Sequence, residues 1–130
     1  MHTSHWNDSW LFWQEKDAFA MVWDIPQNAK PVTLPHDAML ETPARADSFN
    51  GGNTGYRDGG VYVYCKSFFA PEELKEQTVC LKFEGSYCNT SVFVNGHPAD
   101  RPYPAHHGRD QRSVHIGGCH WGDPGRHPAL

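Results

Sequence analysis

The chain has 130 residues, of which 38% are hydrophobic, 20% charged and 13% aromatic. This composition is typical of one small globular domain and argues against a disordered chain. The formal net charge of −4 gives no reason to expect nucleic acid or an anionic membrane as a partner. No apolar run approaches the ~20 residues of a membrane span, and residues 1–8 lack a secretory-signal pattern, so a cytoplasmic protein is expected.

Residues 6–23 are rich in aromatic side chains, tryptophan above all. Flat rings of this kind could stack on a pyranose and form a sugar-binding platform. Clustered aromatic residues more often fill a core or cover a domain interface, and we prefer that interpretation. The run Trp10–Trp13 fits a strand or a short helix, because its periodicity does not separate the two.

Turn-forming residues dominate positions 25–60. Several prolines punctuate the first half of this stretch, and Asn50–Gly55 and Asp58–Gly60 are rich in glycine. Glycines permit left-handed backbone and close approach to a ligand, but they are also typical of any long loop. No Gly-Lys-Ser/Thr follows, so this is not a phosphate-binding loop.

Three strands are predicted between residues 61 and 95. Val61–Phe69 is rich in β-branched and aromatic residues and predicts one long strand. A single helical turn is expected at Pro71–Glu76, with proline at its first position, followed by a second strand at Thr78–Phe83. Thr90–Val94 predicts a third strand, closed by the hairpin signal Asn95-Gly96. Short strands separated by turns favour an all-β protein with a β-sandwich.

Residues 104–130 differ from the rest of the chain. This stretch is rich in histidine, glycine and proline, and its few apolar residues are isolated, with no period of 2 or 3.6. Such a segment buries little surface, so we expect it to be poorly ordered.

Several segments, taken together, resemble family 2 glycoside hydrolases, the group of β-galactosidases, β-glucuronidases and β-mannosidases. Leu34–Met39 is similar to the family's Leu-Pro-His-Asp-Ala element, and Gly59–Phe68 to its long tyrosine-rich strand. Phe83–Gly85 looks like its Phe-x-Gly element, and Val92–Gly96 like its hairpin. The order and spacing also match, over about residues 10–103, and the likeness is greatest to the β-galactosidase branch.

The resemblance implies a jelly-roll, galactose-binding-like β-sandwich over residues 1–103. In the family this is the non-catalytic N-terminal sugar-binding domain. The likeness stops after about residue 103, where the composition also changes, so the sandwich is expected to be incomplete. Residues 104–130 are interpreted as a disordered or aberrant tail, from a shifted reading frame or a damaged gene. Missing strands would leave an open edge and exposed core.

No catalytic residue is predicted in this chain. Family 2 enzymes are retaining hydrolases, which need two carboxyl groups ~5–5.5 Å apart. In the family both belong to a (β/α)₈ barrel of ~250 residues, which is longer than this chain. His36 and Asp37 are adjacent and are interpreted as supporting their own turn rather than as a catalytic dyad.

Neither a cofactor nor a metal is expected. The four cysteines form no Cys-x-x-Cys pair. The metal-capable side chains of the tail lack an ordered scaffold, so their spacing is taken as accidental. These side chains are His106, His107, His115, Cys119 and His120.

Sugar contact remains, and the resemblance assigns it to the loop Ser48–Thr54. In the family the loop before the long strand reaches the mouth of the barrel and offers polar side chains to the galactosyl group. Asn50 and Asn53 are the candidates, because an amide both donates and accepts hydrogen bonds. Alternatively, both asparagines merely tolerate turn geometry.

The expected partner is a galactoside-type carbohydrate in the context of a full enzyme. Two other readings of the whole chain stay open. It could be a subunit that completes a catalytic barrel on another chain, or a free-standing carbohydrate-binding module whose stacking aromatics come from residues 6–23.

Overall fold

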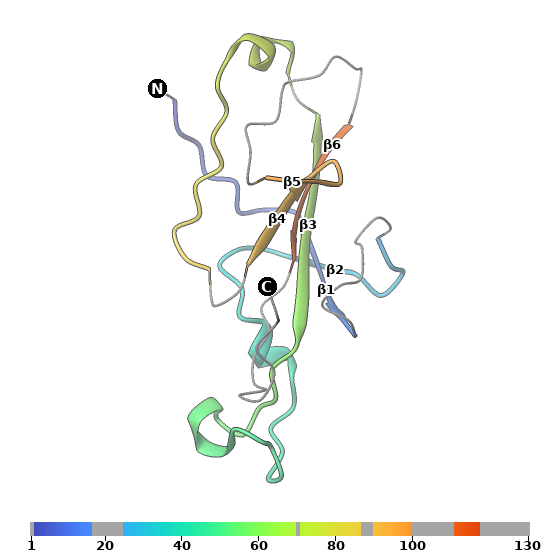
Figure 1. The fold of residues 1–130 in the computed structure, drawn as a ribbon, viewed down its shortest axis with the longest axis vertical. Coiled ribbons are helices and arrows are strands. Elements are labelled where there is room, and N and C mark those ends of the chain that lie inside the picture. Colours follow the sequence, from blue (N-terminus) through green and yellow to red (C-terminus); the bar gives the residue numbers. More distant parts are fainter. Residues whose placement is uncertain (1, 17–24, 70, 87–89, 100–110, 118–130) are drawn as a thin grey trace.

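The computed structural model describes residues 2–16, 25–69, 71–86 and 90–99, and the backbone of 111–117. In these residues the strands form one antiparallel sheet with the order β2-β1-β3-β6-β4-β5 (Figure 1). The strands are β1 (Trp10–Glu15), β2 (Lys30–Val32), β3 (Val61–Phe69), β4 (Ser91–Val94), β5 (His97–Pro98) and β6 (Gln111–Gly117). The all-β class is therefore confirmed, and the jelly-roll arrangement stays a prediction.

Three short 3₁₀ turns connect these strands: η1 (Ala38–Glu41), η2 (Gly51–Thr54) and η3 (Glu72–Glu76). The helical turn expected near residue 71 is present as η3, with Pro71 as the residue that precedes it. Within the described part of the chain, no helix has the length and apolarity that crossing a membrane would require.

β3 is the longest strand of the sheet and has a paired strand on each side. Its β-branched and aromatic residues favour this extended structure. It pairs with β1 from Leu11↔Cys65 to Glu15↔Val61, and with β6 from Val63↔Gly117 to Phe69↔Gln111. The long strand expected over Val61–Phe69 is thus confirmed over the same residues. β1 also shows that the run Trp10–Trp13 is extended rather than helical.

Side chains alternate between the two faces of a strand, so β1 and β3 build two different faces. On one face Trp13, Val63 and Cys65 form a hydrophobic core, with exposures of 3%, 1% and 0%. On the other face the ring of Phe12 lies 5.8 Å from Tyr62 and 5.1 Å from Tyr64, between centroids.

The aromatic residues of β1 belong to these packed faces. Trp10, Phe12 and Trp13 are all buried. For these three residues the core interpretation is confirmed and the sugar-stacking platform is not supported. Residues 17–24, which include Trp23, lie outside the described residues.

The hairpin after β4 follows its sequence signal. Asn95 and Gly96 have φ values of 49° and 77°, the left-handed backbone that a tight two-residue hairpin turn requires. They join the pairs Val94↔His97 and Phe93↔Pro98 of β4 and β5. This strand and its turn are confirmed.

The strand predicted at Thr78–Phe83 is wrong, because the structure assigns no strand there. Its alternating apolar residues stay exposed: Val79 by 63%, Leu81 by 40% and Phe83 by 40%. Within the described residues no neighbouring strand bonds to this segment, and an extended segment becomes a strand only where its backbone groups find a partner.

The expectation of no regular structure after residue 103 is wrong for Gln111–Gly117. These residues form β6, which lies between β3 and β4 and pairs with both. A strand in the middle of a sheet gains backbone hydrogen bonds along both edges, and this does not require a regular apolar pattern. The rest of 104–130 lies outside the described residues, and the domain boundary at 103 stays a prediction.

Candidate functional site

The loop Arg45–Asp58 holds both predicted contact residues and extends from one end of the sheet (Figure 1). Its two ends lie side by side, since the backbone N–H of Arg45 donates to the carbonyl of Tyr56 at 2.7 Å. The N–H of Tyr56 in turn donates to the carbonyl of Gly51 at 2.7 Å. The loop is therefore closed by its own backbone.

One buried side-chain contact also closes this loop. Ser48 is only 9% exposed, and its hydroxyl donates to Oδ1 of Asp58 at 2.7 Å. Leaving a buried polar group without a partner costs about 1–3 kcal/mol, so this bond favours the closed form. The loop is consequently preorganised rather than free to take many shapes.

Asn50 directly precedes η2, and Asn53 lies within it. Asn50 is half-buried and directly precedes the turn, and its side chain makes no capping hydrogen bond. Asn53 is exposed, and its backbone N–H donates to the carbonyl of Asn50 at 3.2 Å. The described positive φ values of this loop belong to Gly51, Gly55 and Tyr56, so left-handed backbone does not explain either asparagine.

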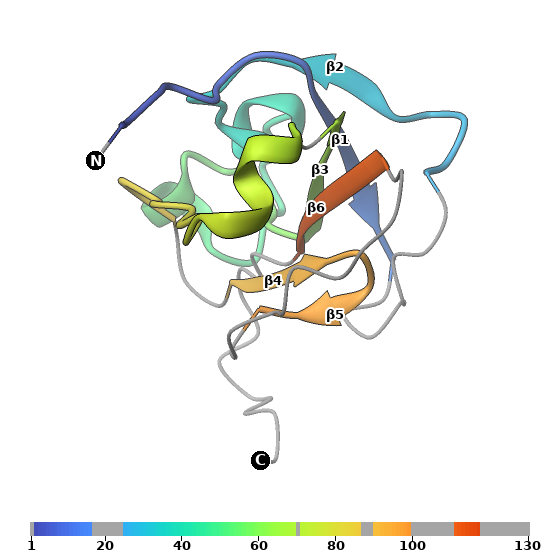
Figure 2. The same cartoon turned by 90° about the horizontal axis from the view of Figure 1, so that it is seen from above.

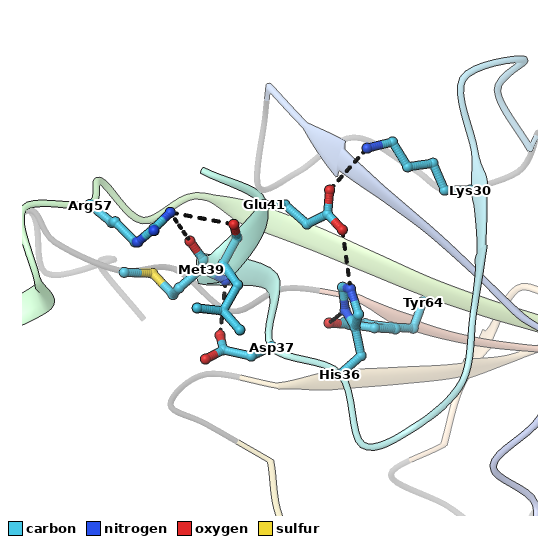
Figure 3. Close-up of polar contacts among 8 residues, drawn as sticks. Lys30, His36, Asp37, Met39, Glu41, Arg57 and Tyr64 are labelled. Carbon is cyan, nitrogen blue, oxygen red and sulfur yellow. Dashed lines mark hydrogen bonds and ion pairs between the residues drawn. The ribbon is translucent and has the colours of Figure 1, made fainter. Parts of the chain in front are cut away.

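Arg57, near the end of the loop, bonds to the segment 39–42 that precedes the loop. Nη1 of Arg57 donates to the carbonyls of Met39 and Leu40, at 3.5 and 3.3 Å. It also donates to the carbonyl of Thr42. Figure 3 shows Arg57 beside Met39. Oδ1 of Asp37 accepts from the N–H of Met39 at 2.9 Å and caps η1. Sequence reasoning missed Arg57, because its role depends on carbonyls far away in the chain.

The side chains of His36 and Asp37 make different contacts. Asp37 supports its own turn, as expected, whereas His36 turns towards the sheet (Figure 3). Nδ1 of His36 lies 2.9 Å from the hydroxyl of Tyr64, and Nε2 lies 3.6 Å from Oε1 of Glu41. Together these contacts hold η1 against the aromatic face of β1 and β3.

Glu41 connects η1 to β2 as well. Its Oε2 accepts from Nζ of Lys30 at 2.9 Å. This hydrogen bond and the charge of Lys30 lower the pKa of Glu41 below its ordinary value, so the carboxylate is charged at neutral pH. Both side chains remain open to solvent, with exposures of 63% for Lys30 and 40% for Glu41.

A recess of about 240 Å³ opens beside this ion pair. Polar side chains from three separate segments line it, together with the buried Phe12 of β1 and Tyr62 of β3. The lining residues with polar ends are Gln14, Asn28, Lys30, Glu41 and Thr42. Sequence reasoning did not find this recess, because no local motif connects residues so far apart in the chain.

The sequence and the fold were compared with those of known proteins. No family model matches the chain. Over 73 residues, 55% of this chain, the sequence is 34% identical to a "putative beta-glucuronidase" of Formosa agariphila, of which the match covers 7%. The fold is similar to part of a β-glycosidase from Bacteroides vulgatus, with a TM-score of 0.64 and 20% identity over 86% of this chain and 16% of that one.

The chain is therefore a domain related to glycoside hydrolases. It spans a small fraction of the length of both proteins, 7% of the first and 16% of the second.

Proposed function

We propose that this chain is a non-catalytic, carbohydrate-contacting domain of a family 2 glycoside hydrolase of the β-galactosidase-like type. In the full enzyme it would help to bind the substrate whose O-glycosidic bond a separate catalytic barrel hydrolyses. The observation that carries the proposal is the loop Arg45–Asp58, which projects from the sheet and is closed by its own hydrogen bonds.

The two asparagines of this loop suit sugar hydroxyls. Among the described residues, no hydrogen bond engages the side-chain amide of Asn50 or Asn53. Each amide can donate to one hydroxyl and accept from another. Because the loop is already closed, ordering it around a ligand costs little additional entropy.

The loop alone cannot bind a sugar tightly. Each hydrogen bond to a hydroxyl replaces one to water and contributes about 0.5–1.5 kcal/mol. Two such bonds give at most about 3 kcal/mol, whereas millimolar binding already needs about 4 kcal/mol. The remaining walls of the pocket must come from elsewhere. This agrees with the small share, 7% and 16%, of the two similar proteins that this chain spans.

Exposed apolar residues near the loop support a role beside a catalytic domain. Phe49 is 72% exposed, Tyr56 50% and, next to the loop, Leu40 69%. The same surface would serve if the barrel were carried on another chain, so a complementing subunit remains the second candidate. A free-standing binding module has less support, because Trp10 and Trp13 are buried.

An exchange of segments tests the proposal. The matching region of the Formosa agariphila protein is replaced by this chain, and hydrolysis of nitrophenyl galactoside and glucuronide is measured. Asn50→Ala and Asn53→Ala should each raise KM about 2- to 10-fold, the loss of one hydrogen bond. Asn7→Ala, an exposed asparagine outside the loop, is the matched control and should change nothing. Unchanged kinetics in both loop variants, with unchanged melting temperatures, would overturn the proposed role of the loop.

A further inference from the structure

The recess beside the Lys30–Glu41 ion pair carries hydrogen-bonding capacity that the fold leaves unused. Among the described residues, no hydrogen bond engages the side-chain amides of Gln14 and Asn28, both of which line the recess. Lys30 and Glu41 bond to each other at 2.9 Å, and both side chains remain partly exposed to solvent. An ammonium group has three donors and a carboxylate about four acceptor positions, so both keep capacity for a ligand.

Apolar residues line the recess beside these polar groups. Phe12 and Tyr62, which lie on the same face of the sheet as Gln14, are 4% and 3% exposed. The hydroxyls of Thr42 and Tyr62 are 3.2 Å apart and satisfy one another. A few convergent polar groups beside apolar side chains are the usual composition of a small-molecule site.

We propose that this recess is a second carbohydrate contact, which takes one neutral pyranose unit. The inference rests on the proposed function, because it assigns a further subsite for the same class of ligand. Vicinal hydroxyls would donate to Glu41 and accept from Lys30, while Gln14 and Asn28 do both. At about 240 Å³ the recess is smaller than the ~300–1,000 Å³ of drug-sized pockets, which limits it to one ring.

The charges of the recess select a neutral sugar. Lys30 and Glu41 carry opposite charges and are already paired, so the recess offers no net positive charge to the carboxylate of a uronic acid. A uronate placed beside Lys30 would also be repelled by Glu41.

Gly60 positions one of the recess amides without lining the recess. A Cβ atom at residue 60 would lie 2.6 Å from Nε2 of Gln14. The φ angle of Gly60 is outside the left-handed region, so alanine is compatible with the backbone there. Gly60→Ala should therefore displace the Gln14 amide, and Gly60 is a positioning residue for this site.

Chemical-shift titration of the full chain with methyl β-galactoside, up to about 0.1 M, tests the inference. We expect saturable shifts at Gln14, Asn28 and the Lys30 and Glu41 backbone, with a dissociation constant in the millimolar range. Gln14→Ala, Asn28→Ala and Gly60→Ala should each weaken binding about 2- to 10-fold. Asn7→Ala, an exposed asparagine outside both the loop and the recess, is the matched control and should leave the affinity unchanged. Methyl glucuronide should bind no more tightly than the galactoside.

The outcomes separate this inference from the proposed function. Shifts confined to residues 48–54 would overturn the recess site and leave the loop proposal standing. Absence of saturable shifts at the recess would also overturn it, and so would tenfold tighter binding of the glucuronide. Thermal unfolding of each variant shows whether it folds. If Gly60→Ala does not fold, the affinities of Gln14→Ala and Asn28→Ala still test the recess site. The proposed role of the loop is tested separately, by the KM of the enzyme that carries this chain in place of its own segment.

Discussion

β3 and the segment Thr78–Phe83 contain the same kinds of residue in opposite surroundings. In β3 the side chains of Val63 and Cys65 are 1% and 0% exposed, whereas Val79 in the other segment is 63% exposed. β3 has β1 on one edge and β6 on the other. The segment Thr78–Phe83 runs beside the sheet without joining it, as Figures 1 and 2 both show. Burial and backbone pairing here depend on neighbouring strands, not on local composition.

The largest difference between the two stretches is expected in the reactivity of their cysteines, Cys65 and Cys80. Burial raises the pKa of the Cys65 thiol from its ordinary 9.0 to about 11, whereas Cys80 is exposed. A shift of this size reduces the reactive thiolate of Cys65 about a hundredfold below that of an ordinary thiol. We expect an alkylating reagent at pH 8 to label Cys80 quickly and Cys65 only through unfolding, as read by peptide mapping. Equal labelling of the two would contradict the buried position of β3.

The same shift in the Cys65 pKa should lower the stability of the fold at alkaline pH. The folded state keeps the Cys65 proton up to about pH 11, whereas the unfolded chain releases it from about pH 9. The folded state binds more protons in this interval, so the free energy of unfolding should fall as the pH rises from 9 to 11. Denaturant titrations across this range measure it, and Cys65→Ala should remove this part of the pH dependence.

Two valines give a matched test of packing. Val63→Ala should lower the free energy of unfolding by about 2–3 kcal/mol, because it leaves a cavity in the core. Val79→Ala should change it by no more than about 0.5 kcal/mol, because the side chain is already in solvent. Urea denaturation followed by circular dichroism compares them directly. Similar costs for both would show that Thr78–Phe83 is packed after all.

Arg57 and Arg45 should differ less strongly in their effect on the free energy of unfolding. Arg57→Ala should lower the free energy of unfolding by about 1–3 kcal/mol, since the carbonyls of Met39, Leu40 and Thr42 lose their hydrogen bonds to the guanidinium group. Arg45→Ala is the control and should have almost no effect, because its pair with Asp47 is open to solvent. Hydrogen exchange at residues 39–42 should accelerate in the first variant alone. An equal response in both would mean that Arg57 does not hold this segment.

The smallest effect is expected at Glu41. Its pKa is held below the ordinary 4.5 by Lys30, so the ion pair stabilises the fold above that pH and loses its contribution as the pH falls through the lowered value. Glu41→Gln should remove this acid sensitivity and alter stability little at pH 7. Acid titration of the melting temperature, with Glu73→Gln as the exposed control, checks both statements.

Elements with strong local signals were predictable from the sequence. β3 has β-branched and aromatic residues over its whole length, and the hairpin has Asn95-Gly96 at its turn. The strand expected at Thr78–Phe83 did not form, because pattern alone does not provide a neighbour. β6 was missed for the opposite reason, since its pairing with β3 and β4 is non-local.

The candidate site was predictable only in part. A family resemblance drew attention to Asn50 and Asn53, but it did not indicate the Ser48–Asp58 bond that closes their loop. Nor could it indicate the recess, whose Gln14, Asn28 and Glu41 meet only after β1, β2 and η1 have packed together.

The affinity of the isolated chain for a galactoside tests the central claim most directly. If this is a contacting domain that needs a catalytic barrel, calorimetry with galactose or lactose should show no binding tighter than the millimolar range. The few hydrogen bonds of the loop and the recess set that limit, because the described residues add no enclosing wall around the sugar. Micromolar affinity would contradict the account and identify the chain as a self-sufficient carbohydrate-binding module.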